Sequence, residues 1–317
     1  MSMEKLRVYF LGAGAIAVPV LEALQSSPLV ELVGAGTQID RPAGRNRRLT
    51  PTPVGEWAAA QNCPIDKVVS VNAPEFIAQL KALRPDIILV ISFGQLLKKE
   101  ILYLDGAVCV NIHASLLPRY RGASPITSAI LQREKVTGIT FMKMAEGLDT
   151  GDIFCACEYR LNGTENALFL ETALGHLAAA QTPEVLVQIA AGRLTAMPQG
   201  AASVSLTHKI RKEHGLIDWH KTAGEIEAMV RGYYPWPGAC FSLEHAGKNL
   251  NLRITAAGMV PDLSGHPGEV LRADKKQWLV ACGDGALELL RVVPEGKKEM
   301  GGADFLRGCR IAAGTVL

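Results

Sequence analysis

The chain has 317 residues, of which 48% are hydrophobic and 20% charged, and its formal net charge is +2 at pH 7. This length suits two ordinary domains. This net charge is too small to indicate a nucleic-acid or membrane partner. Evidence for such a partner must come from local clusters of charge. The apolar run after Lys5 and Arg7 resembles a secretory leader, but Gly12, Gly14 and Pro19 interrupt it and it is too short to span a bilayer. We therefore expect a cytoplasmic protein without a membrane segment.

The seven cysteines are an odd number and lie mostly inside apolar runs, which favours reduced thiols. Cys155 and Cys157 share one face of a predicted strand, yet no further ligands stand at metal-binding spacing. We predict that the role of both is packing and that the chain binds no metal.

In the first half, short apolar runs alternate with helical patterns. Continuous rather than alternating hydrophobicity, as in DIILVIS, indicates strands covered on both faces, and the intervening helices predict a mostly parallel, doubly wound α/β sheet. Ligands bind such sheets at the carboxyl ends of their strands. The predicted strands are 6–11, 30–35, 86–92, 107–112, 136–145 and 152–159, and the predicted helices are 16–26, 53–62, 73–83 and 164–191.

The segment AGRLTAMPQGAASVS has the small, polar and Pro/Gly content of a linker. It predicts a domain at 1–190, a linker at 191–207 and a second domain at 208–317. After a helix near 222–232, strand-like runs separated by Gly, Pro and Asp predict a small β-barrel or sandwich. These runs are 240–245, 249–256, 268–272, 277–282 and 286–293.

The stretch GAGAIA, residues 12–17, fits the GxGxxA dinucleotide fingerprint between a strand and a helix. The fingerprint also needs an acidic residue at the end of the second strand, where this chain has GAGTQ; Glu31 stands near the start of that strand and Asp40 already in the loop. We favour a tight strand-to-helix turn and keep a nicotinamide dehydrogenase as an alternative.

Asn111 and His113 lie two residues apart at the end of an apolar run, in VNIHASLLPRYRGASPI. Side chains at this spacing on a strand point the same way, so both project from a strand end. An amide can stabilise an oxyanion, and an imidazole can transfer a proton near neutral pH. A structural polar pair is the alternative at this point.

Asp149 is the third candidate, in the stretch MAEGLDTGD between two predicted strands. A carboxylate in this turn could approach and hold His113, and Gly147 and Gly151 would let the backbone come close to a ligand. A simple turn residue is the alternative, and Asp152 suits that role better.

Together, NIHASLLPRYRGASPI and GLDTGD resemble the folate-dependent formyltransferases in order and spacing. The resemblance implies that Asn111, His113 and Asp149 are catalytic, that 10-formyltetrahydrofolate donates the formyl group, and that no metal is needed. It also implies a folate pocket bordered by SLLP and by part of SFGQLL, namely Ser115, Leu116, Leu117 and Pro118, with Phe93, Gly94, Gln95 and Leu96.

The stretch DRPAGRNRRLTPTP is an exposed basic loop suited to phosphate contacts, with a solvated charge run as the alternative. It closely matches the pattern TQxDRPxGR plus two basic residues, which methionyl-tRNA formyltransferases insert after the second strand. This resemblance implies that the loop contacts initiator methionyl-tRNA. Its arginines are Arg41, Arg45, Arg47 and Arg48.

The second half carries the same resemblance through DW, YPWPGA, DGALELL, PEGKKEM and DFLRG. It implies a Rossmann-like formyltransferase domain at 1–190 and an oligonucleotide-binding-like β-barrel at 208–317 that binds tRNA. Two departures stand out, because the family's GTP and AYG read GAG at 12–14 and SFG at 92–94 here. The first leaves the shape of that turn open, and the second could alter folate affinity.

We therefore expect a monomeric cytoplasmic enzyme that formylates the amino group of methionyl initiator tRNA. A formyltransferase acting on an amino sugar nucleotide would share the catalytic trio but lack the arginine loop. A tRNA-binding module without catalysis would need the loop but not the trio.

Overall fold

The computed structural model describes residues 5–43, 47–245 and 247–317. The chain divides into two compact units. The first comprises Met1–Pro125, Val136–Arg160 and Glu171–Thr207, and the second Ile126–Lys135, Leu161–Leu170 and His208–Leu317.

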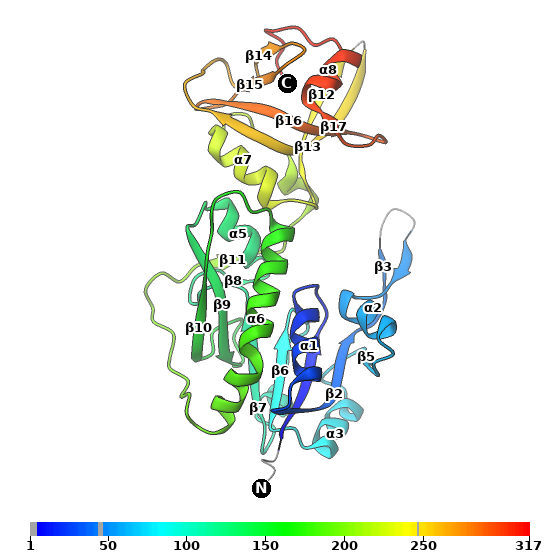
Figure 1. Cartoon of the computed structure of the whole chain (residues 1–317), viewed down its shortest axis with the longest axis vertical. Helices are drawn as coiled ribbons and strands as arrows, with labels where there is room; N and C mark the ends of the chain where they lie inside the picture. The colour runs from blue at the N-terminus through cyan, green and yellow to red at the C-terminus, as the bar shows by residue number, and fades with distance from the viewer. Residues whose placement is uncertain (1–4, 44–46, 246) are drawn as a thin grey trace. The chain divides into compact units, whose positions relative to one another are not determined.

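The first unit contains a seven-stranded sheet in the order β10-β9-β7-β6-β1-β2-β5 (Figure 1). The five strands from β7 to β5 are parallel, and at one edge β9 pairs antiparallel with both β7 and β10. This confirms the predicted Rossmann-like, mostly parallel α/β sheet. Its strands are β1 (Leu6–Gly12), β2 (Val30–Gln38), β5 (Asp66–Val68), β6 (Ile87–Ile91), β7 (Val108–His113), β9 (Val136–Lys143) and β10 (Ile153–Arg160).

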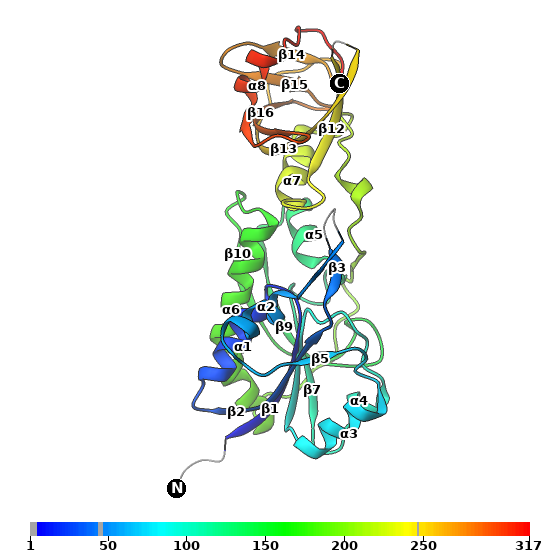
Figure 2. The ribbon, with the colours of Figure 1, turned by 90° about the vertical axis from the view of Figure 1, so that its right-hand side faces the viewer.

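Helices cover both faces of this sheet, with α1 and α6 on one side and α3 and α4 on the other (Figure 2). All five residues of β6 are buried, as a strand covered on both faces requires. The apolar side chains of α3 and α4, with Tyr9, Val90 and Cys109 from the strands, form one core cluster. The helices before residue 191 are α1 (Ala17–Ser26), α2 (Pro53–Ala60), α3 (Pro74–Leu83), α4 (Lys99–Leu102), α5 (Pro125–Leu131) and α6 (Ala167–Ala190). Residues 126–131 of α5 and 167–170 of α6 belong to the second unit.

The arginine-rich stretch, expected as a loop, contains a short antiparallel hairpin of β3 (Arg41–Ala43) and β4 (Arg48–Thr50). Arg41, Pro42 and residues 47–50 are exposed, as suits a segment rich in arginine. Arg45 lies outside the described residues. A second small pair joins β8 (Arg121–Gly122) to β11 (Leu206–Thr207) in parallel.

The second unit is built on a curled antiparallel half-barrel with the strand order β12-β13-β16-β15-β14, and β17 pairs with β16 (Figure 1). Its core holds a run of aromatic contacts from Trp219 through Phe241 and Trp278 to Phe305. The elements are η1 (Lys212–Gly215), α7 (Ala223–Gly232), β12 (Ala239–His245), β13 (Lys248–Val260), β14 (Val270–Ala273), β15 (Trp278–Ala281), β16 (Ala286–Pro294), β17 (Met300–Gly301) and α8 (Gly302–Gly308).

All seven cysteines are free thiols, in agreement with the expectation from the sequence. Within residues 5–43, 47–245 and 247–317, no helix is long and apolar enough to cross a membrane.

Candidate active site

Strand β7 carries Asn111 and His113 to the carboxyl end of the parallel sheet. It lies between β6 and β9, where Asn111 is opposite Val90 and Met142, and His113 is opposite Thr140. The His113 side chain is only 7% exposed, whereas Asn111 is half-buried. The Asn111 side chain makes no hydrogen bond to any residue of the described chain, so its amide is available to a ligand.

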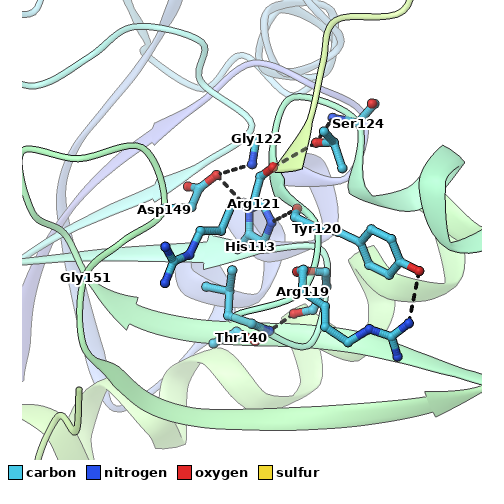
Figure 3. A network of polar contacts seen from close by, with 12 residues as sticks. His113, Arg119, Tyr120, Arg121, Gly122, Ser124, Thr140, Asp149 and Gly151 are labelled. Carbon is cyan, nitrogen blue, oxygen red and sulfur yellow. Dashed lines mark hydrogen bonds and ion pairs between the residues drawn. The ribbon is translucent and has the colours of Figure 1, made fainter. Parts of the chain in front are cut away.

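The His113 ring lies between two acceptor oxygens (Figure 3). Nε2 is 2.9 Å from the carbonyl oxygen of Tyr120, and Nδ1 is 3.5 Å from Oδ2 of Asp149. Both nitrogens can therefore donate when the ring carries two protons. The 3.5 Å separation is long for a hydrogen bond, and catalytic contacts of this kind commonly shorten when substrate binds.

Asp149 lies in the turn between β9 and β10, with φ at 50° and a side chain 13% exposed. The backbone N–H of Gly122 donates to its Oδ2 at 2.7 Å, so the carboxylate is anchored beside the histidine. The turn packs tightly against β9, because a Cβ on Gly151 would lie 1.8 Å from the Lys143 carbonyl oxygen. The structure thus brings His113 and Asp149 together as the sequence predicted.

Hydrogen bonds to Thr140 of β9 hold the SLLP loop, residues 115–118. The Ser115 hydroxyl donates to the Arg119 carbonyl at 2.6 Å, and Thr140 Oγ1 both donates to the Ser115 carbonyl and accepts from the Leu117 N–H. Ser115 is fully buried and Leu117 nearly so, whereas Leu116 and Pro118 are partly accessible. Ser115 therefore supports the loop, and Leu116 and Pro118 are the members that a ligand can reach.

The second predicted folate-bordering stretch follows β6. Phe93 is buried, Gly94 has φ at 77°, and Leu96 is 72% exposed. The Gln95 side chain accepts from the Val71 N–H at 3.0 Å, which ties the stretch to the segment before α3. Its contacts to folate stay a prediction.

The GAGAIA turn lies beside this stretch, since the Gly14 N–H donates to the Ser92 carbonyl at 3.2 Å. Glu171 of α6 accepts from the Ile16 N–H at the start of α1, and burial raises the pKa of this carboxyl. A dinucleotide pyrophosphate would need that helix N-terminus. Because a carboxylate already occupies it and β2 ends in Gln38, the turn does not suit a nicotinamide cofactor.

The described hairpin arginines, unlike His113 and Asp149, are exposed. No ion pair joins Arg41, Arg47 or Arg48 to any of the residues described. The nearby acid Asp40 is engaged by Lys67, whose Nζ is 2.7 Å from both carboxylate oxygens. The three guanidinium groups are therefore available for phosphate.

A cavity of about 420 Å³ lies along α3 and the start of α4. It contains none of the predicted site residues. Within the described ranges, no group of three or more His, Cys, Asp and Glu side chains is placed to hold a metal ion.

Three groups that fix the His113–Asp149 pair were not predicted from the sequence: the Tyr120 carbonyl, the Gly122 N–H and the Gln199 side chain. Gln199 Nε2 donates to the carbonyls of Asp149 at 2.8 Å and Gly151 at 2.7 Å. The first two are backbone groups, which no residue type announces, and Gln199 stood within the predicted linker.

Comparison with known proteins defines the class. Residues 6–186 match the family model described as formyl transferase, and residues 209–310 match the formyl transferase C-terminal domain. The chain therefore belongs to the formyl transferase family.

The similarity to particular members extends over both halves. The chain is 40% identical over 313 residues to a methionyl-tRNA formyltransferase of Methylacidiphilum infernorum (isolate V4), covering 98% of each chain. It is 38% identical over 312 residues to that of Bacillus subtilis (strain 168), covering 98% of this chain and 97% of the relative. A solved N-formyltransferase from Helicobacter canadensis, in complex with folinic acid and dTDP-3-aminofucose, matches with a TM-score of 0.62 at 16% identity, covering 93% of this chain and 100% of that one. At this identity, the last match shows the fold alone.

Proposed function

We propose that the chain transfers the formyl group of 10-formyltetrahydrofolate to the amino group of methionyl initiator tRNA. The observation that carries this proposal is the buried His113–Asp149 pair beside a free Asn111 amide at the end of β7. The near full-length similarity to methionyl-tRNA formyltransferases supports the acceptor.

The reaction is an acyl transfer in which the methionyl amine attacks the formyl carbon. The Asn111 amide donates to the developing oxyanion. The Nε2 proton of His113, which faces the Tyr120 carbonyl in the free structure, leaves that carbonyl when substrate binds, donates to the same oxyanion and then moves to the departing folate nitrogen. Asp149 holds the imidazole and takes the amine proton through a water. One proton thus enters the leaving group and one leaves the amine, and the chain needs no covalent intermediate.

The exposed hairpin of Arg41, Arg47 and Arg48, together with Arg45, is proposed to contact tRNA phosphates. The guanidinium groups of Arg41, Arg47 and Arg48 form no ion pair with the described residues, and such groups can neutralise phosphates and release counterions. We assign formyl transfer to residues 1–190 and further tRNA binding to 208–317, joined by the linker 191–207.

The folate is proposed to border Leu116 and Pro118 on one side and Gly94 to Leu96 on the other, with Ser115, Leu117 and Phe93 as the packing beneath. We expect the enzyme to act as a monomer in the cytoplasm, which light scattering and cell fractionation would check.

Formyl transfer to methionylated initiator tRNA, with an amino sugar nucleotide as competing acceptor, tests the proposal. Formylated methionyl-tRNA is the expected product. Formylation of the sugar alone would overturn the acceptor while leaving the catalytic trio in place.

A further inference from the structure

Gln199 is the residue through which the linker reaches the active site. It lies in the irregular segment between α6 and β11 and is half-buried. Its Nε2 donates to the carbonyls of Asp149 and Gly151, at 2.8 and 2.7 Å. Its Oε1 accepts from Arg121, at 3.0 Å from Nε and 2.7 Å from Nη2. All three partner residues belong to the first compact unit.

These four contacts exhaust what a glutamine side chain can form, because an amide has two N–H donors and two acceptor lone pairs. The surroundings also fix which atom points where. Two carbonyl oxygens on one side require the NH₂ group, and the guanidinium of Arg121 on the other side requires the oxygen. Gln199 therefore holds one orientation and clamps Asp149 and Gly151 from outside the turn.

The turn needs such support because Asp149 adopts a left-handed backbone conformation, with φ at 50°. Such conformations cost free energy for residues other than glycine and persist when neighbouring contacts hold them. The Gly122 N–H holds the carboxylate of Asp149, and Gln199 holds its backbone carbonyl. With both ends fixed, Oδ2 stays directed at Nδ1 of His113.

We infer that Gln199 is a positioning residue of formyl transfer, which acts by holding the Asp149 turn so that its carboxylate faces His113. This inference rests on the roles proposed above for His113 and Asp149. Loss of Gln199 should lower the rate of the chemical step, because Asp149 would no longer be held in place. Substrate binding should stay unchanged, because Gln199 is not proposed to contact the formyl donor or the methionyl amine.

The informative variant is Gln199→Glu. Its carboxylate keeps an oxygen toward Arg121 but places the other against the Asp149 and Gly151 carbonyls, so two donations become repulsions. We expect kcat and the single-turnover rate to fall about 10- to 100-fold, since a small displacement of a catalytic group has that effect. KM for 10-formyltetrahydrofolate and Kd for methionyl-tRNA should stay within about twofold of the parent values. Gln181→Glu, at an exposed position on α6, adds the same charge and should leave kcat unchanged.

Gln199→Leu removes every polar contact without adding charge, and thermal unfolding of both variants checks that the fold is intact. A normal rate for Gln199→Glu with a reduced rate for Gln199→Leu would assign the effect to Arg121 and overturn the inference. Equal loss of binding and rate would also overturn it.

A double-mutant cycle with Asp149→Ala separates this inference from the proposed function. If Gln199 acts through Asp149, adding Gln199→Glu to Asp149→Ala should cause little further loss of kcat. Additive losses would overturn the role of Gln199. An Asp149→Ala variant with the parent rate would instead overturn the catalytic role proposed for Asp149.

Discussion

The His113–Asp149 pair and the β3–β4 hairpin differ in the burial of their polar side chains and in the contacts that hold them. The pair is buried, and each member is also held by a backbone group, Tyr120 O for His113 and Gly122 N–H for Asp149. On the hairpin, Arg47 and Arg48 are exposed and form no ion pair with the described part of the chain. Groups that stabilise a transition state work best when fixed beforehand, whereas groups that contact a flexible phosphate backbone work when left free.

The largest effect is expected from His113→Asn, which keeps a hydrogen-bond donor but removes the group that moves the proton. We expect kcat to fall about 100- to 10,000-fold, the usual contribution of general acid–base catalysis. Single-turnover formylation at saturating substrates measures the rate, and filter binding measures the tRNA affinity, which should not change. A rate within threefold of the parent would contradict the assignment of catalysis to the His113–Asp149 pair and of tRNA binding to the hairpin.

Asn111→Ala tests whether the free amide acts on the oxyanion. Loss of one such donor typically lowers turnover about 100- to 1,000-fold. The single-turnover rate should fall by this amount, and Kd for folate should change little. Weaker folate binding with an unchanged single-turnover rate would show that Asn111 contacts the substrate in the ground state. Asn111 would then be a binding residue, like the hairpin arginines, and not a catalytic one.

The hairpin should give the reverse pattern. Arg47→Ala together with Arg48→Ala should weaken tRNA binding about 10-fold or more at low salt and leave the folate KM alone. Each lost phosphate contact should also reduce the slope of log K against log salt by about one. Lys81→Ala, at an exposed position on α3, is the control for loss of positive charge. Identical salt slopes for the hairpin variant and the parent would identify the arginines as a solvated surface.

The sequence was a good guide wherever one residue type decided the structure. The continuous apolar run predicted at 86–92 is strand β6, Ile87–Ile91, because burial on both faces leaves no polar position. The spacing of Asn111 and His113 and the Gly-flanked Asp149 likewise predicted three residues that the structure places on β7 and in the adjacent turn. The catalytic roles of these residues stay predictions.

Contacts between distant segments, and contacts made by backbone atoms, could not be predicted in this way. Gln199 donates a hydrogen bond to the carbonyl of Asp149, fifty positions away in the sequence. The small and polar residues of segment 191–207 do not indicate such a contact. The C-terminal motifs that carried the resemblance have a physical meaning that sequence reasoning did not supply. Trp219 of DW and Phe305 of DFLRG lie in the hydrophobic core of the second unit.

The smallest expected effect that distinguishes the two regions is a loss of stability at alkaline pH. The sheet that carries the His113–Asp149 pair contains buried groups that ionise with difficulty. Burial raises the pKa of the Cys109 thiol, on the same strand as His113, to about 12. Burial and the hydrogen bond to Asp66 also raise the pKa of Tyr9. The folded chain therefore retains protons that the unfolded chain releases, and the free energy of unfolding should fall as pH rises above about 9.

For a single thiol the slope is at most about 1.4 kcal/mol per pH unit. Urea unfolding under reducing conditions at pH 8, 9.5 and 10.5 measures it, and Cys109→Ala should make the decline shallower. The described residues of the hairpin include neither cysteine nor tyrosine, so the same decline should appear in the Arg47→Ala, Arg48→Ala variant. If the hairpin variant lost the decline, its arginines would be coupled to the sheet, and the two regions would not be independent.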